Sequence, residues 1–315
     1  MKHLHLVPQN TRIRFLSFRK LAYTISGLGV LLSIVLFFSA GLNYGIDFKG
    51  GTLIEIKNKS GPADVSALRS TLGKLKLGDV QIQQFGSPEE VLIRVETQKG
   101  GDAVQQHVIK KIKKILGDGV EYRRVEVVGP KVSGELIYDG ILAVVIAILA
   151  VLVYIWFRFE WQFGLGAVAA LVHDVMLTIG VFSAFQLEFN LSIIAAILTI
   201  VGYSLNDTVV VYDRVRENLR KYKKMPLEEL LDKSINDTLS RTIMTSVTTL
   251  LALLALYIFG GEVIRGFTFA MIWGVIVGTY SSVFIASPVL MYLGVKRDWS
   301  TAGPKTDKKI EGSAG

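Results

Sequence analysis

Three ionisable residues lie within long apolar runs of this 315-residue chain. His173 and Asp174 fall near the middle of the run 163–184, and Asp207 falls about one helical turn before the end of the run 189–211. An ionised carboxylate near the centre of a membrane helix costs about 2.5 to 3.5 kcal/mol, and such residues usually mark ion pathways. We therefore interpret these three residues as candidates for ion coupling, in which ion movement across the membrane drives a conformational change. The alternative is a structural role as polar contacts between helices.

Asp207 has possible companions nearby in the sequence and on the next apolar run. Asn206 precedes it directly, and Arg241 stands at the start of the run 243–260, which returns antiparallel and can bring the guanidinium to the depth of Asp207. Desolvation favours the neutral acid, whereas a nearby cation favours the carboxylate. We hypothesise that Asp207 is charged near Arg241 in one state, and is protonated and released from it in another. The alternative role of Arg241 is to anchor the helix end at the membrane surface.

Hydroxyl side chains recur at helical spacing in the last two apolar runs. Thr242 directly precedes the run 243–260, which has Thr or Ser at positions 245, 246 and 249, and the last run contains the segment Gly278-Thr-Tyr-Ser-Ser282. Many such hydroxyls merely bond a carbonyl one turn back. We expect the last three runs to enclose a polar path that ends on Asp207, lined by Thr245, Ser246, Thr279, Tyr280 and Ser281.

The residues needed for several other chemistries are lacking. The chain has no Cys, which excludes disulfides, thiolate metal sites and cysteine nucleophiles. Its four His stand at positions 3, 5, 107 and 173 without paired helical spacing, and the sequence has no phosphate-binding Gly-x-x-x-x-Gly-Lys segment and no credible hydrolase triad. We therefore expect no enzyme activity, no cofactor and no metal site, and an ion gradient as the energy source for any work.

The composition is that of an integral membrane protein, since half of the residues are hydrophobic and the mean hydropathy is +0.43. Six runs are long enough to cross about 30 Å of hydrocarbon. They lie near 21–40, 136–156, 163–184, 189–211, 243–260 and 266–293. The fold class predicted is therefore a polytopic α-helical membrane protein with six transmembrane helices. Small residues recur every four positions along the last run, which predicts a close helix-packing seam: Gly266, Ala270, Gly274, Gly278, Ser282 and Ala286.

Basic residues indicate the orientation of these helices. Arg12, Arg14, Arg19 and Lys20 precede the first run, and further basic residues follow the second, fourth and sixth runs. The positive-inside rule then places both termini in the cytoplasm, and it accounts for the net charge of +8 without a nucleic-acid partner. We expect cytoplasmic segments at 1–20, 212–242 and 294–315, and an uncleaved first helix at 21–40.

The segment 41–135 between the first two helices is predicted to be a folded extracytoplasmic domain. Its hydrophobic pattern predicts the order strand, helix, strand, strand, helix, strand, near 52–56, 62–75, 80–85, 91–96, 102–116 and 121–128. This split βαβ pattern is typical of the α+β ferredoxin-like fold, which by itself implies no activity. We interpret it as a contact domain.

Ordered motifs along nearly the whole chain make it resemble the SecD/SecF family of bacterial protein-export membrane proteins, relatives of the resistance-nodulation-division transporters. The motifs are Gly45-Ile-Asp-Phe-Lys-Gly-Gly51, Val128-Gly-Pro-Lys-Val-Ser-Gly-Glu-Leu136, Ala170-Leu-Val-His-Asp-Val175, the segment 202–218, Ser240-Arg-Thr242 with Thr245-Ser246, and Gly278-Thr-Tyr-Ser-Ser282. The family's intramembrane Asp falls on Asp207 and its Arg on Arg241, whereas Asp47 receives no role.

The resemblance implies a protein-export function in the bacterial cytoplasmic (inner) membrane. Its implied partners are a SecD subunit, the SecYEG channel, YajC, YidC, the translocating polypeptide and membrane lipid. The family is thought to use a proton or sodium gradient to promote late steps of export. Two alternatives stay open: a passive scaffold that links SecD to SecYEG, and a half-transporter for small-molecule efflux within the same superfamily.

Overall fold

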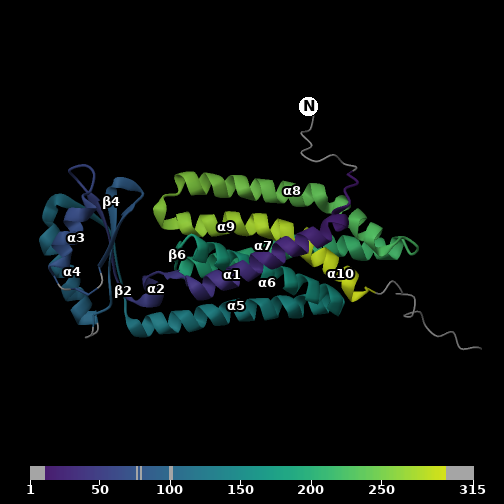
Figure 1. Ribbon diagram of the computed structural model, residues 1–315, viewed down its shortest axis with the longest axis horizontal. Coiled ribbons are helices and arrows are strands. Elements are labelled where there is room, and N and C mark those ends of the chain that lie inside the picture. The colour runs from purple at the N-terminus through teal and green to yellow at the C-terminus, as the bar shows by residue number, and fades with distance from the viewer. Residues whose placement is uncertain (1–10, 76, 79, 99–101, 296–315) are drawn as a thin grey trace, which may run out of the picture.

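The computed structural model describes residues 11–75, 77–78, 80–98 and 102–295. This part of the chain contains six helical segments that are long and apolar enough to cross a membrane. They form one bundle, and a small β-sheet domain lies at one end of it (Figure 1). The predicted fold class is therefore confirmed. We call the end beside the sheet the domain end, and the opposite end the far end.

The bundle is built from long helices that begin and end close to the predicted apolar runs. They are α1 (Arg19–Ser39), α5 (Pro130–Arg158), α6 (Trp161–Ala184), α7 (Leu191–Lys221), α8 (Leu227–Phe259) and α9 (Glu262–Ser281). The last span continues through a π-helical turn, η3 (Ser282–Ala286), into α10 (Ser287–Leu293). A short 3-10 helix, η1 (Phe15–Phe18), precedes α1 at the far end.

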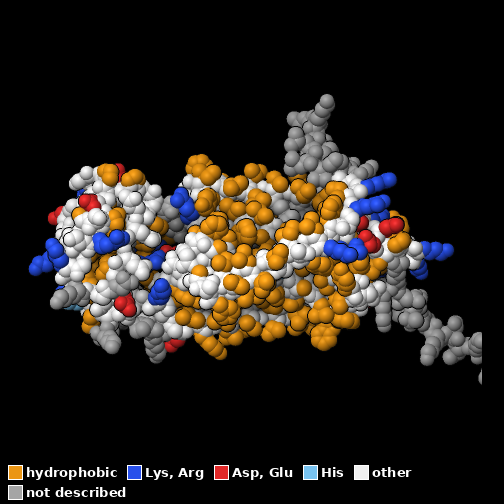
Figure 2. Space-filling model, in the orientation of Figure 1, with side chains coloured by type: hydrophobic (Ala, Val, Ile, Leu, Met, Phe, Trp, Pro, Cys, Tyr) orange, Lys and Arg blue, Asp and Glu red, His pale blue; other side chains and the backbone are white. Residues whose placement is uncertain are grey.

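The outer surface of the bundle is apolar. Figure 2 shows hydrophobic side chains over most of the visible face of the helices, while charged side chains gather at the two ends. The exposed apolar residues come mainly from α1, α5 and α8. Because lipid tails favour apolar contact and exclude charge, this distribution is that of a membrane-embedded protein.

The sheet domain has the ferredoxin-like topology. Its elements are β2 (Gly51–Asn58), α3 (Val65–Gly73), β3 (Val80–Phe85), β4 (Ser87–Val95), α4 (Asp102–Leu116) and β5 (Val120–Val128), with a 3-10 turn η2 (Gly117–Gly119) before β5. The strand order is β3-β4-β2-β5 with antiparallel neighbours. Helices α3 and α4 cover the face away from the bundle (Figure 1). Their apolar side chains and those of the strands form a separate core.

Short elements join the domain to the bundle, and the sequence patterns do not predict them. They are β1 (Asn43–Tyr44), the single turn α2 (Ile46–Lys49) and β6 (Glu188–Phe189). Strands β1 and β6 pair in parallel. The linker after α1 is thereby attached to the linker between α6 and α7.

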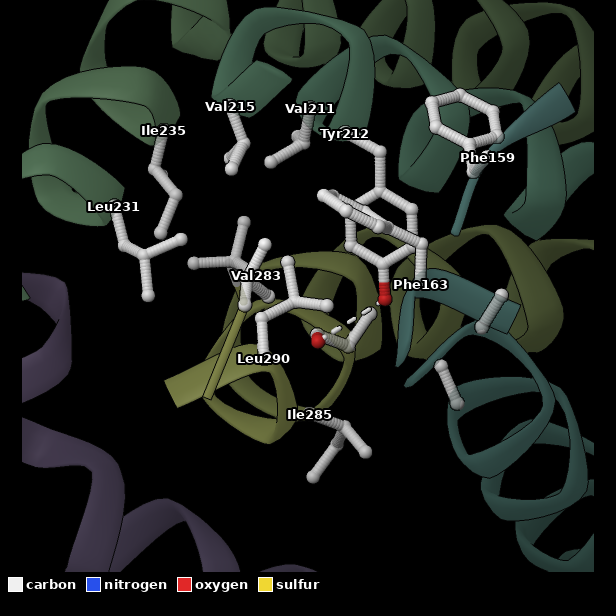
Figure 3. Close-up of a cluster of buried hydrophobic side chains, with 14 of the residues drawn as sticks. Phe159, Phe163, Val211, Tyr212, Val215, Leu231, Ile235, Val283, Ile285 and Leu290 are labelled. Atoms are coloured by element: carbon white, nitrogen blue, oxygen red, sulfur yellow. Dashed lines mark hydrogen bonds between the residues drawn. The ribbon is translucent and has the colours of Figure 1, made fainter. Parts of the chain in front are cut away.

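The segment 212–242, predicted to be a cytoplasmic connection, is helical over most of its length. Helix α7 continues to Lys221 and α8 begins at Leu227, so only 222–226 connects them. Apolar residues continue at helical spacing on both helices and enter a buried cluster at the far end (Figure 3). The Tyr212 hydroxyl in this cluster donates to the Ala286 carbonyl in the π-helical turn at 3.1 Å.

The small residues of α9 lie against α7. A side chain at Gly274 would collide with Ile200, and a Cβ at Gly278 would lie 3.0 Å from that of Ser204. The two backbones therefore approach closely, as the spacing of small residues predicts.

Candidate functional site

Asp174 is the centre of a buried polar cluster in the bundle. Its side chain is 1% exposed, and its two oxygens form hydrogen bonds with side chains on three helices. His173 Nδ1 on α6 lies 2.9 Å from Oδ1, while the hydroxyls of Ser204 on α7 and Ser281 on α9 donate to Oδ2 at 2.6 and 2.8 Å. Both oxygens are therefore satisfied by protein groups, and Asp174 joins α6, α7 and α9.

Three consecutive residues of α9 contact three different helices. Ser281 reaches Asp174 on α6, whereas the Thr279 hydroxyl lies 2.7 Å from that of Ser246 on α8. The Tyr280 hydroxyl donates to the Ala22 carbonyl of α1 at 3.1 Å. Each of these three side chains therefore connects α9 to a different helix.

His173 connects this cluster to Tyr280. The two rings are stacked, with centroids 6.0 Å apart and planes inclined by 30°. The imidazole is buried, and its Nε2 atom has no hydrogen-bond partner among the described residues. A buried imidazole nitrogen without a partner is uncommon, so Nε2 is a polar atom that the described part of the chain leaves unsatisfied.

Asp207 has a different environment from Asp174. It lies on α7 three residues after Ser204, and its side chain is 2% exposed. Oxygen Oδ2 is buried without a hydrogen-bond partner in the described part of the chain. No described cation, Arg241 included, forms an ion pair with Asp207. Asp207 is thus a buried carboxyl group with one oxygen that the described residues leave unsatisfied.

The remaining candidates are dispersed. Asn206 and Arg241 are exposed, although both adjoin buried residues on their helices. The Thr245 hydroxyl donates to the Thr242 carbonyl of its own helix at 2.9 Å, as hydroxyls in helices commonly do. The hydrogen bonds of the described residues therefore gather polar side chains around Asp174, and the predicted path ending on Asp207 stays a prediction.

Sequence reasoning missed two residues that belong to the polar cluster. Ser204 donates to Asp174, and Ser26 on α1 places its hydroxyl 3.0 Å from that of Tyr280. Ser204 could have been found, because it stands one helical turn before Asp207 on the same face. Ser26 carries no such signal, since its role depends on how α1 packs against α9.

Asp47 also acquires a structural role. Its Oδ2 accepts from the backbone N–H of Leu191 at 2.8 Å, so the carboxylate caps the N-terminus of α7. Next to it, the Gly45 N–H donates to the Phe189 carbonyl at 2.8 Å. A carboxylate at this position satisfies a free N–H and complements the helix dipole. The glycine-rich segment after α1 is thus attached to the first turn of the helix that carries Asp207.

Two family descriptions match the chain. Residues 107–296, more than half of it, match "Protein export membrane protein SecD/SecF, C-terminal", and residues 35–57 match "SecD/SecF GG Motif". The chain belongs to the SecD/SecF family. Asp174 and Asp207 lie in the first matched region, and Asp47 lies in the second.

Relatives in this family are similar over the full length of the chain. The protein translocase subunit SecF of Cereibacter sphaeroides is 47% identical, covering 97% of this chain and 96% of the relative. The SecF subunit of Rickettsia rickettsii is 48% identical over 91% of this chain. These matches place the chain among protein translocase subunits.

Larger relatives contain this sequence as one part. The protein translocase subunit SecDF of Brucella abortus is 44% identical, covering 98% of this chain but 41% of the relative. The crystal structure of SecDF from Thermus thermophilus, a translocon-associated membrane protein, superposes with a TM-score of 0.82 at 35% identity. The superposition covers 91% of this chain and 39% of the SecDF chain. The chain therefore spans about two fifths of the SecDF proteins it matches.

Proposed function

We propose that this protein associates with a SecD subunit and uses a proton or sodium gradient to promote late steps of protein export across the cytoplasmic membrane. The SecDF relatives support the association, because each joins a segment similar to this chain to a longer remainder. In this proposal the SecD partner supplies that remainder, and the pair docks on the SecYEG channel, where YajC and YidC are further partners.

One observation carries the ion coupling: Asp207 is buried in the bundle with an oxygen that no described residue satisfies. A carboxylate in that setting is unfavourable, whereas the protonated acid is tolerated. The conformation described here, in which Asp207 and Arg241 form no ion pair, fits the protonated and released state of the switch. A second conformation would bring Arg241 close to a charged Asp207.

Protonation and helix movement are then linked in both directions. A conformation that separates Asp207 from Arg241 favours the proton, and the bound proton favours that conformation. One proton crossing about 100 mV releases about 2.3 kcal/mol. That amount biases a two-state element but does not unfold a stable domain, which suits action on chains that are already unfolded.

Charged residues at the far end support a cytoplasmic location for that end. Basic side chains gather there in ion pairs, including Arg158 with Asp213 at 3.2 Å, Arg214 with Asp237 at 3.1 Å and Arg19 with Glu228 at 3.0 Å. Both η1 and α10 also lie at this end (Figure 1). We therefore place both termini in the cytoplasm and the sheet domain outside.

Vesicle translocation with the reconstituted complex tests this function. After the ATP-driven step is stopped, an imposed proton or sodium gradient should stimulate export by the native complex. Asp207→Asn should abolish that stimulation while membrane insertion and SecD binding persist, since the amide resembles the protonated acid. Arg241→Met should also impair it, because the charged state loses its partner.

Two results would contradict the proposal. Full gradient stimulation of the Asp207→Asn complex would move the coupling elsewhere, and Asp174 would be the next residue to replace. A native complex that responds to neither gradient, yet still holds SecD on the channel, would instead support a passive scaffold.

A further inference from the structure

A cleft of about 700 Å³ lies between the sheet domain and the domain end of the bundle. Leu53, Leu92 and Arg124 line it from the face of the sheet that α3 and α4 leave open. Phe185, Tyr257 and Phe269 line it from the bundle. The end of β3, residues 83–86, forms part of the same wall. The volume is in the range of typical ligand sites, and the lining mixes apolar and charged groups.

Strand β3 is an open edge of the sheet beside this cleft. It is the first strand in the order β3-β4-β2-β5 and pairs only with β4. No described backbone segment other than β4 bonds to residues 82–85, and of their outward groups the Ile82 carbonyl accepts from the Arg69 side chain. Gln81, Gln83 and Gln84 are exposed along its length. Backbone groups of an open edge strand are free to pair with another extended chain.

The two edges of the sheet differ in charge. The opposite edge, β5, carries Glu121, Arg123, Arg124 and Glu126 among nine residues, whereas the six residues of β3, Val80–Phe85, include none. Charged side chains on an edge strand discourage pairing with other chains. Edge β5 is therefore protected against an added strand, and edge β3 is not.

One hydrogen bond indicates which residues of β3 point outward. The Ile82 carbonyl accepts from the Arg69 side chain of α3 at 3.3 Å, so this carbonyl is directed away from β4. Alternate residues of an antiparallel strand point their N–H and C=O groups the same way. The N–H of Gln84, two residues later, therefore also points away from β4.

We propose that the open edge of β3 binds the translocating polypeptide as an added β-strand. Every unfolded chain carries the backbone groups that such pairing requires, so the contact does not depend on the exported sequence. Alternate side chains of the added strand would lie over the open sheet face and project into the cleft. This inference rests on the proposed export function, and it assigns the edge of β3 as the surface that contacts the translocating polypeptide.

Crosslinking in the reconstituted complex tests the location. The chain has no native Cys, so Gln83→Cys on β3 and Glu121→Cys on β5 each introduce a unique thiol. An export substrate stalled in the channel, carrying a thiol-reactive group at successive positions, should link to Gln83→Cys at least about fivefold more than to Glu121→Cys, a difference of about 1 kcal/mol. Equal yields, or crosslinks from Gln83→Cys to SecD in place of the substrate, would overturn the inference.

Replacement of Gln84 tests the mode of binding. In the Gln83→Cys background, Gln84→Pro removes an outward N–H without removing a bond to β4, whereas Gln84→Ala keeps that N–H. Loss of one backbone hydrogen bond should lower crosslinking about fivefold for Gln84→Pro and leave Gln84→Ala unchanged. Gln84→Lys adds the edge charge that β3 lacks and should also lower the crosslinking yield. It replaces Gln84→Pro as the test if the proline variant fails to fold. Unchanged crosslinking of a folded Gln84→Pro or Gln84→Lys complex would overturn the inference.

The outcomes distinguish this inference from the proposed function. If Asp207→Asn abolishes gradient-stimulated export while Gln83→Cys fails to link to substrate, the strand-pairing inference alone is wrong. If substrate links to Gln83→Cys but Asp207→Asn exports normally under a gradient, the ion-coupling proposal alone is wrong.

Discussion

Asp174 and Asp207 are both buried in the bundle, yet their surroundings assign them different tasks. Both oxygens of Asp174 are satisfied, because they form hydrogen bonds with His173, Ser204 and Ser281 on three helices. Asp207 has an unpartnered buried oxygen. A compensated carboxylate contributes to packing and specificity, whereas an uncompensated one responds to protonation. We therefore expect Asp174 to hold the helices together and Asp207 to change its charge.

Matched replacements at the residue scale test this division. Asp174→Leu leaves three donors without their acceptor, and we expect it to lower the free energy of unfolding by about 2 to 4 kcal/mol. Asp207→Leu removes no hydrogen bond between described residues. It should change the free energy of unfolding by less than about 1 kcal/mol. Unfolding of the purified protein in mixed micelles measures both. A larger loss for Asp207→Leu than for Asp174→Leu would reverse the assignment.

The sequence predicts the charged residues of this site better than their partners. His173, Asp174 and Asp207 are recognisable because ionisable groups are rare within apolar runs. The direction of each hydroxyl is not recognisable, because it depends on helix rotation. Thr279 and Ser281 are two residues apart in one helix, yet they contact α8 and α6.

At the scale of elements, the segment Gly45–Gly51 connects the domain to the bundle. Asp47 caps α7 through the Leu191 N–H, and β1 pairs with β6 just before that helix. These contacts join residues about 140 positions apart in the sequence, as the separation of 144 for Asp47 and Leu191 shows. Periodicity does not reveal such short strands, whereas the long helices and the six-element domain follow directly from their apolar patterns.

The Asp47 cap predicts a local effect on α7. Asp47→Ala should destabilise the first turn of the helix by about 1 kcal/mol, because the Leu191 N–H loses its acceptor. Asp47→Asn keeps a side-chain oxygen and should retain most of the stability. Amide hydrogen exchange at Leu191 measures the difference. Equal exchange rates in the native protein and Asp47→Ala would show that the contact does not hold this helix end.

At the scale of the whole molecule, the sheet domain and the bundle have separate cores. The domain core lies between the sheet and its two helices, while the bundle contains its own apolar clusters. Between them lie the cleft, an apolar cluster of Ile46 with Leu53 and Leu92, and an ion pair of Arg94 on β4 with Glu188 on β6. Units with separate cores commonly move relative to each other. The domain is therefore suited to act as an arm whose position the bundle controls.

A reversible crosslink across this interface tests the arm. Arg94→Cys and Glu188→Cys, joined by a short bis-methanethiosulfonate reagent, would fix the domain to the β6–α7 linker. Glu90→Cys and Arg123→Cys provide the matched control, because this native ion pair, 3.6 Å long, lies entirely within the domain.

If the domain must move when Asp207 changes its charge, the first crosslink should abolish gradient-stimulated export and reductant should restore it. The control crosslink should leave export unchanged, since it spans no moving boundary. Normal export with the Arg94–Glu188 positions fully crosslinked would mean that the domain and α7 work as one rigid body, and the force on the polypeptide would then have to come from movement within the bundle.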